Sequence, residues 1–172
     1  MSIRIQNIQN FLLMHDFVTT PLGWFHFLVS LAAMVLGAFV LATPKGTRRH
    51  KRVGYAYVFS MLLVCGSAFG IYRLTGRFGI FHVAAIVGFL TLAGGMVPLL
   101  LRGIDPGYKA MHLWFMYYSV MGLYAAFASE LIVRIPDKPF YTMVGIATGA
   151  IFGIGTIFIL RKEKVWTRHF VR

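Results

Sequence analysis

The chain has 172 residues, of which 58% are hydrophobic, 16% aromatic and only 13% charged. A soluble domain has about 25% charged residues, so these values exclude an ordinary soluble globule, and the aromatic content excludes a disordered chain. The net charge of +12 would also suit a protein that binds nucleic acid. On an apolar chain, however, basic residues more commonly set membrane topology, so we expect no nucleic-acid partner. The single cysteine, Cys65, excludes an intramolecular disulfide.

The composition predicts an all-α fold, a polytopic membrane bundle that forms one domain over residues 1–172. Residues 1–20 have apolar side chains at helical spacing but lack a continuous apolar core, which favours an interfacial helix over a signal peptide. Five apolar stretches follow, each long enough to cross a hydrocarbon core of about 30 Å. They comprise residues 22–42, 53–72, 79–101, 111–133 and 140–160. We expect the first four to form the bundle core and the fifth to pack alongside.

Basic residues are distributed unevenly between the two ends of these spans. Twelve of the seventeen Lys and Arg lie in three places: the segment 45–52, the loop between the third and fourth spans, and the tail 161–172. Cytoplasmic loops carry an excess of Lys and Arg, so this distribution predicts an N-terminus outside and a cytoplasmic C-terminal tail. The protein is therefore expected in the plasma membrane as a multi-pass protein.

A histidine lies near the start of each of the first four spans: His26, His50, His82 and His112. Because consecutive spans are antiparallel, His26 and His82 should lie near the outer surface, and His50 and His112 near the cytoplasmic surface. Two neutral imidazoles that face each other across a bundle are the axial ligands of a low-spin b-type haem. The pattern therefore favours a transmembrane electron carrier with two bis-histidine haems, which would exchange electrons with a quinone or another redox partner.

Three arginines at the cytoplasmic surface, Arg48, Arg49 and Arg52, are candidates to pair with haem propionates. Glu130 follows on the same helical face as His112, about 27 Å further along and thus level with the outer pair. It is a candidate proton carrier. Together with His26 and His82 it would alternatively form a site for a divalent metal such as zinc, with an open coordination position. A salt bridge at the helix end would explain Glu130 equally well.

The fifth span contains Gly145, Gly149 and Gly153, which form two overlapping Gly-x-x-x-Gly steps. Such steps allow helices to approach closely, within the bundle, in a homodimer or in a membrane complex. A third hypothesis follows, in which the protein is a non-enzymatic accessory or structural subunit. The sequence leaves open whether the protein is an enzyme.

Two motifs sixty residues apart begin with histidine: His50–Tyr57, with the sequence HKRVGYAY, and His112–Ser119, with the sequence HLWFMYYS. They resemble a bacterial family of predicted membrane proteins, domain of unknown function 2306, over about residues 22–135. Here Tyr55 replaces an arginine of the family pattern and Phe115 replaces a tryptophan. The resemblance implies a helical protein of the bacterial inner membrane and no particular activity. The layout of the four histidines is also similar to that of transmembrane di-haem cytochromes b.

Overall fold

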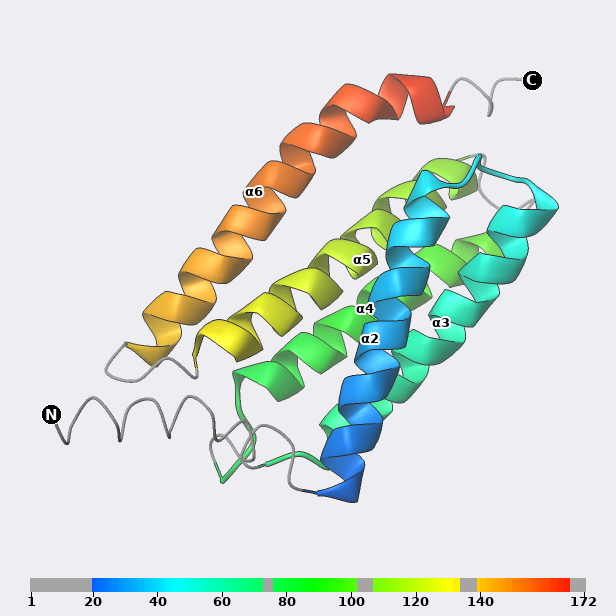
Figure 1. Ribbon diagram of the computed structural model, residues 1–172. Helices are drawn as coiled ribbons and strands as arrows, with labels where there is room; N and C mark the ends of the chain where they lie inside the picture. Colours follow the sequence, from blue (N-terminus) through cyan, green and yellow to red (C-terminus); the bar gives the residue numbers. More distant parts are fainter. Residues whose placement is uncertain (1–19, 73–75, 102–106, 134–138, 168–172) are drawn as a thin grey trace, which may run out of the picture.

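The computed structural model describes residues 20–72, 76–101, 107–133 and 139–167. These ranges are helical and contain no strand, which confirms the predicted all-α class (Figure 1). The described helices are α2 (Pro21–Ala42), α3 (Arg48–Ala68), α4 (Ile80–Leu100), α5 (Tyr108–Ile132) and α6 (Phe140–Thr167). The interfacial helix predicted for the N-terminal segment lies outside the described residues.

Threonine side chains cap the first two of these helices. The Thr20 hydroxyl accepts a hydrogen bond from the Gly23 N–H at 3.1 Å, and Pro21 occupies the first helical position, where no N–H is needed. The Thr47 hydroxyl accepts from the His50 N–H, also at 3.1 Å. Helix α3 therefore begins before the apolar span predicted from residue 53, because the basic residues that follow Thr47 are already helical.

Four of the described helices, α2, α4, α5 and α6, are long and apolar enough to cross a membrane. Large apolar side chains cover their outer faces; for example, Val35 is 68% exposed and Ile154 is 71% exposed. Such a surface is suited to lipid rather than water. Helix α3 is long enough to cross, but its mean hydropathy is too low because its first five residues include four cations. Four of the five predicted spans are therefore helices suited to cross a membrane. That α3 also crosses the membrane stays a prediction.

Helices α2 to α5 form a four-helix bundle in which α3 lies next to α2 and α4, and α5 lies next to α4 and α2. This order makes α2 diagonal to α4 and α3 diagonal to α5. Helix α6 packs mainly along α5 and stands beside the bundle, as predicted for the fifth span (Figure 1). The two ends of the bundle are therefore the places where side chains of diagonal helices meet.

The centre of the bundle is closely packed and contains few polar groups. The Tyr57 ring is fully buried, and its hydroxyl lies 2.9 Å from the Ser119 Oγ, which links the diagonal helices α3 and α5. The Tyr124 hydroxyl donates to the Met34 carbonyl oxygen at 3.1 Å and links α5 to α2. Gly37 lies against Tyr57, where an added Cβ would come within 3.2 Å of the ring. These contacts fix how the helices are rotated, and therefore which way the histidines face.

Candidate functional site

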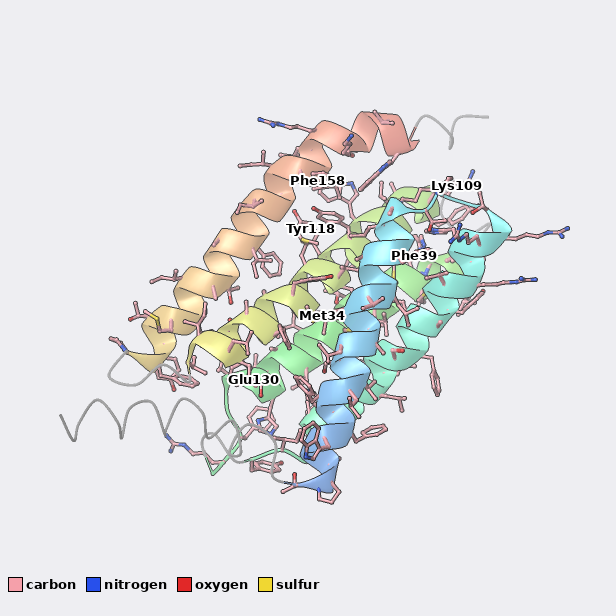
Figure 2. All side chains as sticks on the ribbon, in the orientation of Figure 1. Met34, Phe39, Lys109, Tyr118, Glu130 and Phe158 are labelled. Atoms are coloured by element: carbon pink, nitrogen blue, oxygen red, sulfur yellow. The ribbon has the colours of Figure 1, made fainter. Side chains whose placement is uncertain are left out.

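One end of the bundle brings His50 of α3 and His112 of α5 together. We call it the inner end because the sequence predicts that it faces the cytoplasm, and we call the opposite end the outer end. Their ring centroids are 6.5 Å apart and the ring planes are inclined at 83°. Figure 2 shows Phe39 and Lys109 at this end and Glu130 near the opposite one. The diagonal arrangement of α3 and α5 is the reason that two residues so far apart in sequence meet, as the alternation of spans predicted.

His112 is held by helix α4. Its Nδ1 lies 2.9 Å from the Gly95 carbonyl oxygen, which only accepts hydrogen bonds, so Nδ1 is the donor and the lone pair is on Nε2. Gly95 also allows the close approach of the two helices, because an added Cβ would lie 2.8 Å from the Met116 side chain. Histidines that bind metals commonly donate their other ring N–H to a carbonyl in this way.

The His50 ring has an unsatisfied nitrogen. Its Nδ1 atom is buried and has no hydrogen-bond partner within the described part of the chain. A buried polar atom of this kind usually has a partner such as an ordered water, an ion or a ligand. The unpartnered Nδ1 of His50 and the Nε2 lone pair of His112 therefore lie in the same small region.

Lys45, in the loop between α2 and α3, is a member of this site that the sequence did not single out. Its Nζ donates to the Leu41 carbonyl oxygen at 2.8 Å and the Val40 carbonyl oxygen at 3.2 Å, and lies 4.6 Å from the centroid of the Trp166 ring. Its charge acts electrostatically on both His50 and His112. Burial lowers the pKa of Lys45 from 10.5 to about 8. The one signal in the sequence was its position four residues after Leu41, within reach of the free carbonyls at the end of α2.

The three arginines predicted to pair with propionates lie on the exposed surface of the first turns of α3. The guanidinium of Arg49 lies over the Phe39 ring of α2, 4.8 Å from its centroid. Lys45, by contrast, acts electrostatically on both imidazoles.

The last turns of α6 cover part of the same end. The Trp114 Nε1–H donates to Glu163 Oε1 at 3.2 Å, and the ring of Trp166 lies 6.2 Å from that of Tyr117. Together with the contact between Trp166 and Lys45, these interactions tie α6 to the bundle close to the inner histidines.

At the outer end, His26 of α2 contacts α3. Its Nδ1 lies 2.8 Å from the Ser67 Oγ, and the Ser67 hydroxyl itself donates to the Leu63 carbonyl oxygen at 2.7 Å. The Val64 carbonyl oxygen is a further hydrogen-bond partner of this imidazole. Glu130 of α5 acts electrostatically on the same imidazole, so it lies at the end of the bundle where the helical spacing predicted it.

His82 of α4 has a different environment. Its Nδ1 accepts a hydrogen bond from the Gly79 N–H at 3.1 Å, so the ring proton is on Nε2. The ring is 3% exposed and lies between Tyr72 and Phe78, whose centroids are 4.7 and 4.9 Å away. In this state His82 offers no lone pair from Nε2. Ligation through that atom would require the loss of the bond to Gly79.

A metal site of three protein ligands has no support at the outer end. Within the described ranges, no group of three or more His, Cys, Asp or Glu side chains is arranged to hold a metal ion. His26, His82 and Glu130 are therefore not gathered into the predicted His-His-Glu group.

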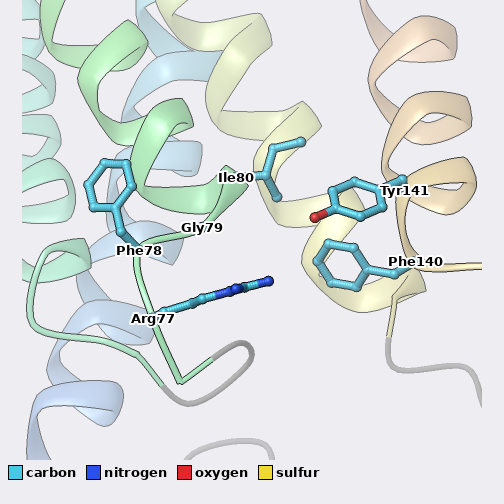
Figure 3. A pocket seen from close by; sticks show the side chains of 6 residues that line it. All are labelled: Arg77, Phe78, Gly79, Ile80, Phe140 and Tyr141. Atoms are coloured by element: carbon cyan, nitrogen blue, oxygen red, sulfur yellow. The ribbon is translucent and has the colours of Figure 1, made fainter.

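A hollow of about 480 Å³ lies between the starts of α4 and α6 (Figure 3). The side chain of Arg77 extends across it toward Phe140 and Tyr141. The remaining lining residues are Phe78, Gly79 and Ile80. The hydropathy of single spans did not predict this hollow, because it forms between two helix starts that are distant in sequence.

Comparisons of the chain with protein-family models, with curated proteins and with solved structures returned no match.

Proposed function

We propose that the protein is an integral membrane electron carrier in which His50 and His112 are the axial ligands of a b-type haem. The observation that carries the proposal is the separation of the two rings, 6.5 Å between centroids. Two imidazoles on diagonal helices at this separation are residues that would hold a bis-histidine haem. The bound haem would supply the one-electron chemistry, and the chain would hold and orient it.

The hydrogen bonds of the pair support the same assignment. The Gly95 carbonyl keeps the proton of His112 on Nδ1 and directs the Nε2 lone pair to the ligand. The orphaned nitrogen of His50 would gain a partner. Lys45 is better placed than Arg48, Arg49 or Arg52 to offset a propionate, because its charge already acts on both imidazoles.

The outer pair supports a second haem less directly. The Nε2 of His82 carries a proton and therefore offers no lone pair. We therefore assign the first haem to the inner pair and leave Glu130 as a proton carrier beside His26. The basic residues at the inner end support a cytoplasmic location for that end, in the plasma membrane of a bacterium.

The absorption spectrum of the purified protein tests this function. After expression in haem-replete cells, the wild type should show a Soret band, with one haem per chain by the pyridine haemochrome assay. His50→Ala and His112→Ala should each lose the low-spin bands, and His82→Ala should keep them. Circular dichroism of each variant checks that the helices remain. A folded but colourless wild type would refute the proposal. Two haems per chain would indicate that His26 and His82 bind a second haem.

A second candidate function is that of an accessory subunit that docks through α6. It is favoured by one observation: at Gly145, Gly149 and Gly153 no atom of the described chain lies within 4 Å of an added Cβ. This face is open to a second helix.

The second candidate predicts that Gly149→Leu abolishes a co-purifying complex or homodimer without unfolding the chain. The matched change is Gly155→Ala, on a packed face where the added Cβ would lie 2.8 Å from Met121. That change should lower the melting temperature instead, because Met121 must move. Size-exclusion chromatography with light scattering measures both. A monomer in all three proteins argues against docking through this face.

A further inference from the structure

We propose that the inner end of the molecule binds the phosphate headgroup of an anionic phospholipid, in a groove between the end of α2 and the start of α3. This inference is independent of the histidine pair and of any haem. It rests on two features of the described chain: a cluster of exposed cations and a small hollow beside one of them.

The cations lie within the first five residues of α3 and all are exposed: Arg48, Arg49, Lys51 and Arg52. We call this set the basic patch. The first turn of α3 contains no acidic residue. Cations near the positive end of a helix dipole are unfavourable, so the patch is a source of electrostatic repulsion that a bound anion would relieve.

The hollow has a volume of about 170 Å³ and is lined by Phe39, Ala42, Thr43, Pro44 and Arg49. The Thr43 hydroxyl donates to the Phe39 carbonyl oxygen at 2.7 Å, so the charged donor of the hollow is Arg49. Its guanidinium lies over the Phe39 ring, 4.8 Å from the centroid, and this contact limits the freedom of the side chain. A planar guanidinium recognises phosphate well, and the apolar wall suits the glycerol and upper acyl chain of a lipid.

The position of the groove favours a lipid over other anions. It lies at the end of an apolar helix, where Phe39 itself is 44% exposed, so one side of the groove is apolar and the other is cationic. Such a boundary is the depth of the headgroups in a bilayer. Bound headgroups would also hold the charged start of α3 at the membrane surface, which its own hydropathy does not do.

Native mass spectrometry of the full chain in a neutral detergent, titrated with phosphatidylglycerol or phosphatidylcholine, tests the proposal. The wild type should retain phosphatidylglycerol in preference to phosphatidylcholine, and increasing salt should weaken the retention. Each arginine removed from the basic patch should weaken binding roughly fivefold, so Arg49→Gln should show this loss and the double change Arg48→Gln with Arg49→Gln a larger one. Arg49→Lys should recover part of the binding because it keeps the charge.

The matched control is the double change Arg161→Gln with Lys162→Gln. These cations are also exposed and lie toward the same end of the molecule, on α6, so the control removes the same charge from outside the groove. It should alter phosphatidylglycerol binding by less than twofold. Equal losses in the control and the groove variants would overturn the proposal, as would equal retention of the two lipids by the wild type. Protection against heat by inorganic phosphate alone, with no further gain from the lipid, would instead assign the groove to a free anion.

Discussion

The ammonium group of Lys45 is partly buried at the C-terminal end of α2. The ammonium group replaces water with two carbonyl oxygens and an aromatic ring, and burial lowers its pKa to about 8. The protonated form is therefore less favourable in the folded chain than in the unfolded one. At pH values below 8 both states are protonated and the penalty is present in full.

A pH dependence of stability follows from this lysine. Between pH 8 and its ordinary pKa of 10.5, the folded chain releases the proton before the unfolded chain does, so the penalty fades and stability rises. The Lys45→Gln variant keeps hydrogen-bond donors but has no charge. Relative to this variant, the melting temperature of the wild type should increase as the pH rises from 7.5 to 10. If the melting temperatures of the two proteins changed with pH in parallel, the ammonium group of Lys45 would be exposed to water rather than buried.

At the scale of single residues, a local hydrogen bond decides which of the predicted pairs forms. His82 is the third residue of α4, and its ring bends back to accept the Gly79 N–H. This local bond competes with any partner on a distant helix. Span order predicted correctly that His50 and His112 meet, because that pairing depends on topology. It could not predict the environment of His82, which depends on the capping geometry of one turn.

Helix α3 is the element for which hydropathy and structure differ most. Hydropathy averaged along the sequence places the start of the apolar span at residue 53, whereas the helix capped by Thr47 begins at Arg48. The same cations keep α3 below the hydropathy expected of a membrane span. Helix α3 nevertheless has 21 residues, as many as α4, and packs between α2 and α4. We therefore expect α3 to cross the bilayer as part of the bundle.

Labelling of introduced cysteines tests that crossing. The native Cys65 is only 4% exposed, so a membrane-impermeant maleimide should leave the wild type nearly unlabelled in intact cells. Arg77→Cys, beyond the end of α3, should be labelled from outside, and Lys51→Cys only after the cells are permeabilised. Both native residues are exposed, so access does not limit the reaction. Labelling of both positions from the same side would mean that α3 does not cross.

At the scale of the whole molecule, the number and approximate positions of the described helices were predictable because apolar runs of membrane length are strong signals. The diagonal order of helices was predictable from short connections. The groove beside Arg49 and the position of Lys45 were not, because both depend on how side chains fold back at helix ends. Prediction was thus most successful where one periodic pattern extended over a whole helix.

The ring of contacts from α2 through α3 and α4 to α5 has a consequence for biogenesis. Helices enter the membrane in chain order, and the bundle closes only when α5 packs against α2. The two inner histidines come from the second and fourth members of this ring, so the pair does not exist until α5 has been inserted. Any group that required both rings could be held only after α5 has been inserted. Trp166, near the end of α6, is made after α5, so its contact with Lys45 forms later than the pairing of the two histidines.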